Sequence, residues 1–156
     1  MEILAADRSH YAGIVKLITS REELFQFFPC GSYPVDENQL IRLAQRRRDL
    51  TVVTERGEVV GFANIYGVFP GKRSFIGNLL VSKHYRGQGI GKRLVQHMMD
   101  LAFDKYGDEV HLSVFGFNAR ALLLYASLGF KPYDVEQRIT PNGERVALIH
   151  MRVRKA

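Results

Sequence analysis

Cysteine is almost absent from this 156-residue chain, which has only Cys30. A single cysteine cannot form an intrachain disulfide. The five histidines are scattered along the chain and, with Cys30, give no zinc-ligand spacing. We therefore expect neither a disulfide scaffold nor a metal site.

Long apolar runs are also missing. The longest ones are soon interrupted by charged residues, and the opening residues MEILAAD have neither the basic head nor the apolar stretch of a signal peptide. No segment is low in complexity, has the composition of a linker or repeats. We therefore expect a single globular domain over residues 1–156, cytoplasmic and away from the membrane.

Acidic residues are outnumbered, with 16 Asp and Glu against 22 Lys and Arg, which gives a formal charge of +6. A positive field favours a polyanionic partner through steering and charge neutralisation. Nucleic acid, an acidic protein and a phosphate-rich cofactor all fit this balance, and charge alone does not choose among them.

Hydrophobic periodicity and turn residues predict alternating strands and helices. The expected strands cover residues 2–6, 50–54, 59–68, 74–81, 110–114, about 130–139 and 144–152. The expected helices cover residues 8–20, 36–48, 90–106 and 118–128, with an aromatic loop between the first two. This βααβββαβαββ order predicts a mixed α/β fold, in which about four helices flank a mostly antiparallel sheet of about seven strands. Arg46, Arg47 and Arg48 are interpreted as cations that complement the C-terminal end of a helix dipole.

A glycine-rich segment joins one predicted strand to the next helix. Gly87, Gly89 and Gly91 alternate there, so that backbone N–H groups can face one point, and Arg86 and Lys92 add positive charge. The spacing differs from that of a P-loop and from that of a dinucleotide fingerprint. The segment predicts a phosphate or pyrophosphate site, although a tight connection without a ligand is the alternative.

The pattern Arg86-x-x-Gly89-x-Gly91 resembles the acetyl-CoA signature of the GNAT acyltransferase superfamily. Residues 118–130, from Asn118 to Phe130, resemble that family's downstream helix, and the predicted element order is similar as well. The match in motifs spans about 78–133, whereas residues 1–77 match in element order only. The resemblance implies an N-acetyltransferase that moves the acetyl group directly from acetyl-CoA to a primary amine of a small molecule, peptide or protein, without a metal.

The resemblance also implies the residues of a cofactor site. The main chain of Leu79, Leu80 and Val81 would pair with the pantetheine amides, Asn118 would contact pantetheine, and Tyr125 would lie near the thioester sulfur as general acid. The pyrophosphate cradle would be formed by Arg86, Gly87, Gln88, Gly89, Ile90, Gly91 and Lys92. As alternatives, Asn118 is a helix N-cap and Tyr125 a core aromatic residue.

The expected strand over 74–82 contains no acid that could take a proton from the acceptor amine. Such an amine is mostly protonated at neutral pH and must lose a proton before it attacks. The candidates for the base are Asn78 through an ordered water, His111, and the pair Glu22 and Glu23. A buried, satisfied histidine or a solvated glutamate is the structural alternative.

Acceptor choice is expected to depend on residues 21–35, the segment that walls the acceptor groove in the family. This segment holds four aromatic residues that suit a small or partly apolar amine, namely Phe25, Phe27, Phe28 and Tyr33. These side chains could instead pack the segment onto the core.

Two other functions stay open from the sequence. A catalytically silent CoA-binding regulatory module fits the absence of a strand carboxylate. A basic nucleic-acid-binding protein fits the charge and the Arg42 to Arg48 region, but the sequence has no recognised nucleic-acid motif. Association into a homodimer is also left open.

Overall fold

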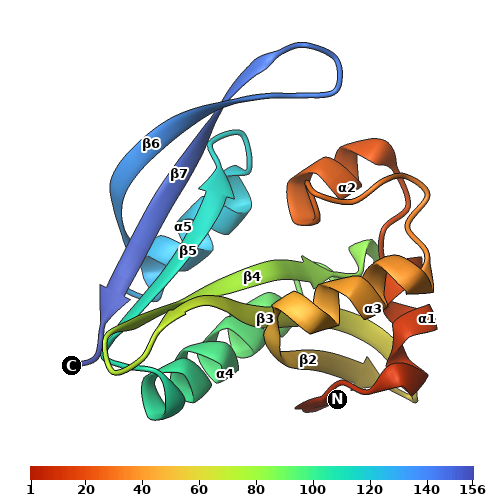
Figure 1. Ribbon diagram of the computed structural model, residues 1–156, viewed down its shortest axis with the longest axis horizontal. Helices are drawn as coiled ribbons and strands as arrows, with labels where there is room; N and C mark the ends of the chain where they lie inside the picture. Colours follow the sequence, from red (N-terminus) through yellow and green to blue (C-terminus); the bar gives the residue numbers. More distant parts are fainter. The chain divides into compact units, whose positions relative to one another are not determined.

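The computed structural model describes residues 1–156, which contain both helices and strands (Figure 1). The strands are β1 (Glu2–Ala5), β2 (Arg48–Glu55), β3 (Glu58–Phe69), β4 (Arg73–Val81), β5 (Glu109–Phe115), β6 (Lys131–Ile139) and β7 (Arg145–Arg154). The α-helices are α1 (Tyr11–Lys16), α2 (Arg21–Phe27), α3 (Glu37–Arg46), α4 (Ile90–Lys105) and α5 (Ala119–Ser127). Two 3-10 helices, η1 (Arg8–His10) and η2 (Lys83–Tyr85), precede α1 and follow β4.

The seven strands form a sheet in the order β1-β2-β3-β4-β5-β7-β6. The β1–β2, β2–β3, β5–β7 and β6–β7 pairs are antiparallel, whereas β4 and β5 are parallel. The chain divides into two compact units, residues 1–66 with 76–98 and residues 67–75 with 99–156. We call them unit 1 and unit 2, and β3, β4 and α4 contribute residues to both.

The core of unit 1 is built around β3, which is buried at every residue from Val59 to Ile65. Continuous burial means that both faces of the strand are covered. Residues of α1, α2 and α3 pack with Phe62 and Leu80 on one of these faces. Helix α3 is amphipathic and begins at Asp36, whose side chain accepts a hydrogen bond from the Gln39 backbone N–H.

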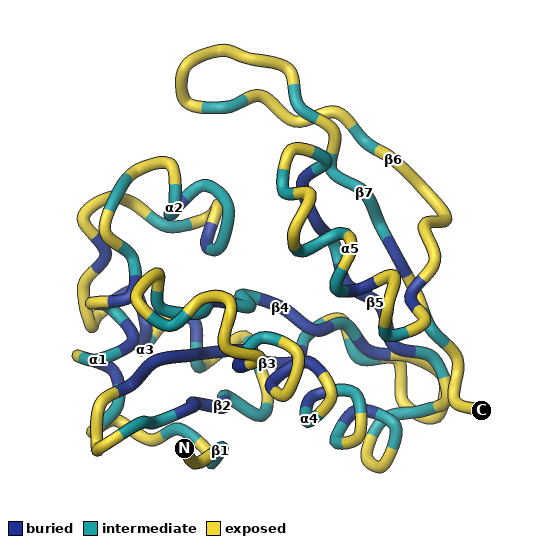
Figure 2. Tube along the Cα trace, turned by 180° about the vertical axis from the view of Figure 1, so that it is seen from behind, coloured by how far each residue is buried: buried dark blue, intermediate teal, exposed yellow.

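Unit 2 contains the β5–β7–β6 part of the sheet and α5. Asn118 caps α5 through a hydrogen bond from the Ala121 N–H, and Gly129, with φ of +96°, follows its end. The β6–β7 turn uses Gly143 with φ of +84°, a conformation that glycine adopts readily. Strand β6 is exposed along most of its length (Figure 2).

The predicted fold class and element order are confirmed, with one addition and one shortening. Residues 21–27, expected as part of an aromatic loop, form α2 because Ser20 caps the Glu23 N–H and Pro29 lies beyond the helix end. The first helix, expected over 8–20, is reduced to η1 and the six residues of α1. No helix is long and apolar enough to cross a membrane.

The connection from α4 to β5 generates the first testable prediction. A Cβ on Gly107, where φ is +141°, would lie 2.5 Å from the backbone nitrogen of Lys72. A Cβ on Gly71, where φ is +77°, would have no atom within 4 Å, so this glycine serves as the control. We expect Gly107→Ala to lower the free energy of unfolding by about 3 kcal/mol or more and Gly71→Ala by about 1 kcal/mol, measured by urea denaturation. Equal losses would mean that the close approach of the two backbones has no energetic weight.

Candidate functional site

The turn between β4 and α4 depends on glycine conformations. Gly87 and Gly89 have φ of +81° and +83°, which side chains other than glycine rarely adopt. A Cβ on either residue would meet no protein atom within 4 Å. The two glycines are therefore required by the backbone and at the same time leave an open surface over the turn.

Helix α4 begins directly after this turn and is 16 residues long. The Arg93 N–H donates to the Gly89 carbonyl at 3.1 Å, so the N–H groups of Ile90, Gly91 and Lys92 precede the first intrahelical hydrogen bond. These donors and the positive end of the helix dipole favour an anion at this point. The predicted cradle thus has the geometry of a phosphate site.

Arg86 is held at the edge of the cradle by two hydrogen bonds. Its Nε donates to the Val81 carbonyl at 3.3 Å, and its Nη2 lies 3.3 Å from the Glu23 carboxylate on α2. Burial acts to raise the pKa of Glu23, but hydrogen bonds from Thr19 and the Arg86 charge outweigh it and lower this pKa. The lowered pKa makes Glu23 a weaker base, and both of its carboxylate oxygens are already bonded to Thr19 or Arg86, so Glu23 is disfavoured as the base. Glu22 is exposed in the first turn of α2.

The edge of β4 is open where the sequence predicted main-chain contacts. Pairing with β5 is confined to Arg73–Phe75 opposite Glu109–His111. Leu79, Leu80 and Val81 lie beyond this short ladder, so their backbone groups on that side have no registered strand partner. An extended ligand could hydrogen-bond there as an additional strand.

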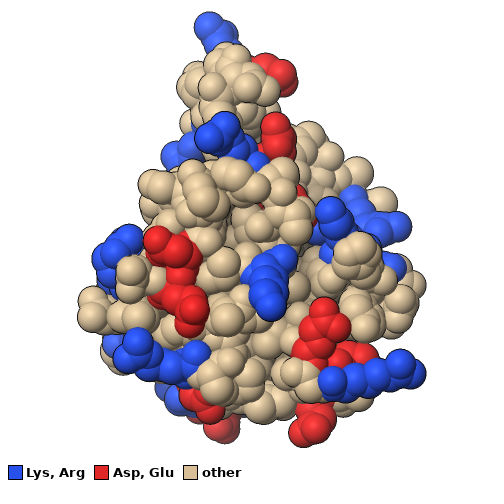
Figure 3. Space-filling view, turned by 90° about the vertical axis from the view of Figure 1, so that its right-hand side faces the viewer, with Lys and Arg blue, Asp and Glu red and all other residues tan.

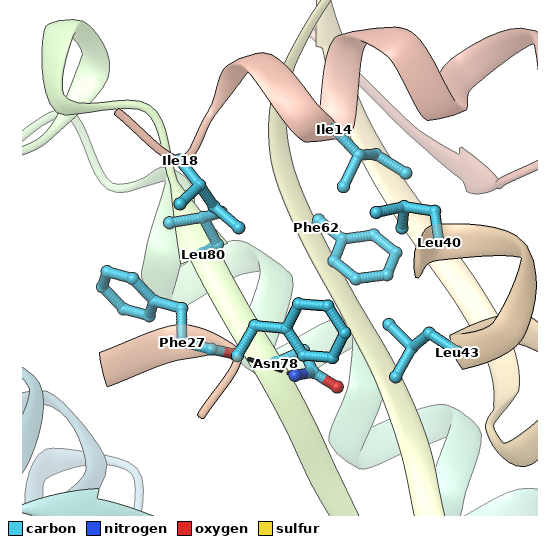
Figure 4. Close-up of a pocket in the computed structure, with 9 residues that line it drawn as sticks. Ile14, Ile18, Phe27, Leu40, Leu43, Phe62, Asn78 and Leu80 are labelled. Atoms are coloured by element: carbon cyan, nitrogen blue, oxygen red, sulfur yellow. Dashed lines mark hydrogen bonds between the residues drawn. The ribbon is translucent and has the colours of Figure 1, made fainter. Parts of the chain in front are cut away.

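Asn78 has a left-handed backbone, with φ of +50°, within β4. Its Nδ2 donates to the Phe27 carbonyl at 2.8 Å, and its Oδ1 accepts from Asn64 Nδ2 at 2.9 Å. Together with Phe27, Phe28, Leu80 and residues of α1, α3 and β3, it lines a small apolar pocket (Figure 4). Asn78 thus joins α2, β3 and β4.

The four predicted acceptor residues differ in exposure. Phe28 is buried in the core, and Phe27 packs against that core. Phe25 is half-buried. Tyr33 is 38% exposed, donates its hydroxyl hydrogen to the Thr19 carbonyl at 3.2 Å and lies beside Arg21. Phe28 therefore has the core role that was the alternative, and Tyr33 has the most accessible ring.

Unit 2 contains the other two residues predicted for the cofactor. Asn118 is the N-cap of α5, as its alternative interpretation required, and it is half-buried. Tyr125 is 7% exposed and packs edge-on against Phe130. Burial raises the pKa of the Tyr125 phenol, so this group stays protonated at neutral pH.

His111 is satisfied on both ring nitrogens. Its Nε2 is 2.8 Å from a Glu109 carboxylate oxygen and its Nδ1 is 2.7 Å from the Tyr133 hydroxyl. Since a carboxylate only accepts, Nε2 carries the proton and Nδ1 accepts from Tyr133. This network agrees with the structural alternative, in which His111 is a buried partner within unit 2 rather than a free base.

Sequence reasoning missed Arg47 and Asn64. Arg47 was interpreted as a cation at a helix end, but its guanidinium turns inward and stacks on Tyr66, with 3.9 Å from Cζ to the ring centroid. That interpretation is therefore wrong for Arg47, where the chain leaves α3 in an extended conformation, and for Arg48, which is the first residue of β2. In the sequence, the only indication for Asn64 was that a polar residue stands within the otherwise apolar run 59–68.

Charged side chains do not gather into one basic stripe on the face shown in Figure 3, where Lys and Arg lie among Asp and Glu. An extended nucleic-acid footprint requires a continuous basic surface. This face gives no support to the nucleic-acid alternative.

The model of the Acetyltransferase (GNAT) family matches residues 16–130, and this chain belongs to that family. A probable spermine N(1)-acetyltransferase of Bacillus subtilis subsp. natto is 35% identical over 101 residues, 58% of this chain and 62% of that protein. The [ribosomal protein bS18]-alanine N-acetyltransferase of Escherichia coli is 30% identical over 99 residues, 62% of this chain and 66% of that protein. The matched part thus spans less than two thirds of either relative.

Solved structures show the same fold. The ribosomal-protein-S18-alanine N-acetyltransferase from Escherichia coli superposes with a TM-score of 0.77 at 22% identity, over 99% of this chain and 94% of that chain. A GNAT superfamily phosphinothricin acetyltransferase from Sinorhizobium meliloti, solved in complex with AcCoA, superposes with a TM-score of 0.80 at 18% identity. The superposition covers 99% of this chain and 88% of that chain.

The His111 network predicts how stability depends on pH. Burial lowers the pKa of His111, against the opposing effect of Glu109, so the unfolded chain binds a proton more readily than the folded one. Stability should therefore fall as the pH drops below the unfolded value of about 6.5. We expect His111→Gln to flatten this slope between about pH 7.5 and 5.5, as measured by urea denaturation at several pH values. An unchanged slope in His111→Gln would contradict the assignment.

Proposed function

We propose that this protein is an acetyl-CoA-dependent N-acetyltransferase that acts on a primary amine. The turn at Gly87 and Gly89 carries the proposal, because its left-handed glycines and the open space over them fit a pyrophosphate at the start of α4. Membership of the GNAT family supports the same ligand. Bound acetyl-CoA would supply an activated acetyl thioester, so the chain needs no nucleophile of its own.

The residues of unit 1 would bind and orient the cofactor. Residues 86–92 would hold the pyrophosphate through backbone N–H groups, with Arg86 adding charge from the position fixed by Val81 and Glu23. The unpaired edge at Leu79, Leu80 and Val81 would hydrogen-bond the pantetheine amides.

Proton movement would depend on Asn78 and Tyr125. The amide oxygen of Asn78 has a second lone pair beside the hydrogen bond from Asn64, and it could hold the water that removes the amine proton. Tyr125, protonated at neutral pH, could donate to the leaving thiolate, and Asn118 could contact pantetheine while it caps α5. The resemblance in motifs supports the last two roles.

The acceptor is an amine of unassigned identity. The relatives are named for spermine, thialysine and the alanine of a ribosomal protein, which are different kinds of acceptor. Thiol release from acetyl-CoA, measured over a panel of polyamines, amino acids, aminoglycosides and peptides, tests the activity. Binding of CoA without turnover on any acceptor would favour the silent regulatory module instead.

Gly89 tests the cradle. A valine would be strained at φ of +83° and would place its side chain in the space proposed for the pyrophosphate, so Gly89→Val should weaken CoA binding by roughly 100-fold or more. Gly143→Val is the matched control, because φ is +84° there and no atom lies within 4 Å of a Cβ. The control should keep the wild-type affinity in calorimetric titration with CoA. Equal affinities of wild type and Gly89→Val would refute the assignment.

Tyr125→Phe removes one hydroxyl and keeps the ring. The structure gives that hydroxyl no protein hydrogen bond, so thermal stability and CoA affinity should change little. As one positioned acid, Tyr125 should contribute roughly 100-fold to kcat, a modest effect because a thiolate is already a fair leaving group. Melting temperature and kcat are measured on the same preparation. Wild-type kcat in the variant would show that Tyr125 is a core aromatic only.

A further inference from the structure

Arg47 turns its side chain into unit 1 instead of into solvent. Its guanidinium stacks on the Tyr66 ring of β3, and its Nη1 lies against β4, 2.8 Å from the position that a Cβ on Gly77 would take. The ring and the glycine backbone together fix the plane of the guanidinium. Such a preorganised fork suits a planar anion.

Arg47 is half-buried, and its guanidinium has no carboxylate partner. Nη1 is buried and donates no hydrogen bond, and none of the ion pairs in the structure includes Arg47. Arginine keeps its charge in proteins, and an unpaired charge away from water is costly. An anion from outside the chain would supply the missing acceptor.

Asn64 is a second polar residue on the same face of β3 that has a side-chain atom without a hydrogen-bond partner. Asn78 Nδ2 donates to the Phe27 carbonyl, so Asn78 Oδ1 must accept, and Asn64 must therefore use Nδ2 as its donor. This orientation leaves Asn64 Oδ1 as the atom that is not used in the bond to Asn78. Asn64 is fully buried, and its Oδ1 has no hydrogen-bond partner.

The two atoms without a hydrogen-bond partner, Arg47 Nη1 and Asn64 Oδ1, lie on neighbouring parts of unit 1. Asn64 and Tyr66 are two residues apart on β3 and so share a face, and Gly77 and Asn78 are adjacent on β4. Arg47 Nη1 is a cationic hydrogen-bond donor, and Asn64 Oδ1 is a neutral acceptor. A molecule that carries both a carboxylate and an amine has the complementary groups.

We propose that Arg47 binds a carboxylate of the acceptor, while Asn64 Oδ1 accepts a hydrogen bond from the acceptor's N–H. The substrate class is then an amine that also carries a carboxylate. This inference rests on the proposed acetyltransferase function, and it adds a specificity residue to that function.

Matched pairs of amines test the inference, each pair differing only in the carboxylate: L-phenylalanine with 2-phenylethylamine, and L-lysine with 1,5-diaminopentane. Wild type should acetylate the carboxylate-bearing member of at least one pair with the higher kcat/KM. Arg47→Gln should lower that kcat/KM by about 10- to 100-fold, the range for one charge-assisted interaction, and change the other member's by less than about threefold. The KM for acetyl-CoA should stay the same.

Arg46→Gln, at an exposed position in the last turn of α3, is the matched control and should behave as wild type. Arg47→Lys keeps the charge without the planar fork, and it should lie between wild type and Arg47→Gln. If Arg47→Gln does not fold, the same comparison of kcat/KM within each pair of amines is made with Arg47→Lys. Equal losses on both members of a pair, or no preference in wild type, would overturn the inference.

A binding measurement separates this inference from the proposed function. Wild type should be stabilised against heat more by L-phenylalanine or L-lysine than by the paired amine without the carboxylate, and Arg47→Gln should lose this difference, whether or not acetyl transfer occurs. If CoA binds and no amine is acetylated, the proposed function fails while this readout still tests Arg47. Equal stabilisation of both proteins would overturn the Arg47 assignment alone.

Discussion

The left-handed backbone of Asn78 is the constraint around which the interior of unit 1 is arranged. A non-glycine residue in this conformation costs about 1–3 kcal/mol, and it persists where surrounding contacts define it. Here two side-chain hydrogen bonds, to the Phe27 carbonyl and from Asn64, offset that cost. The end of α2 is thereby tied to β4, which brings Phe27 and Asn78 to one pocket. Because the Phe27 carbonyl can only accept, it also fixes the orientation of both amides.

Charges in this protein fall into two groups with different physical meaning. Glu23 with Arg86, and Glu109 with Arg154, form ion pairs and hydrogen bonds within the chain, so their charges are accounted for by the fold. Arg47 is different, because it is partly buried and its Nη1 has no acceptor. Replacing the paired residues would disturb packing and local order. The unpaired one is the place where a ligand could add an interaction that the fold does not supply.

The absence of a carboxylate on β4 also affects which group could remove the proton from the acceptor amine in the proposed reaction. A strand carboxylate could take the amine proton directly, whereas this chain presents Asn78, which cannot act as a base by itself. His111 does not fill the gap readily, because both of its nitrogens are engaged and burial favours its neutral form. Positioning of the acceptor and access of water therefore carry more of the proposed catalysis than in an enzyme with a dedicated base.

The local part of the structure was predictable from the sequence. Turn glycines, N-caps at Asp36 and Asn118, and the alternating strands predicted the element order, because these signals act over a few residues. Helix α2 was missed, since its cap at Ser20 is followed by an aromatic segment without clear periodicity. The cradle at 86–92 was also predictable, as positive φ and a helix start depend on local residue type.

The tertiary structure alone decided which polar groups remain without a partner. Arg46, Arg47 and Arg48 look alike in the sequence, but in the structure Arg46 ends α3, Arg48 begins β2, and Arg47 between them contacts Tyr66 and Gly77. Glu23 and His111 looked available as bases, but partners 63 residues away at Arg86 and 22 residues away at Tyr133 engage them. Such pairings join segments far apart in the chain, and no local propensity encodes them. The sequence therefore determined the glycine turn at the start of α4, and the tertiary structure determined that Arg47 is the arginine whose Nη1 has no hydrogen-bond acceptor.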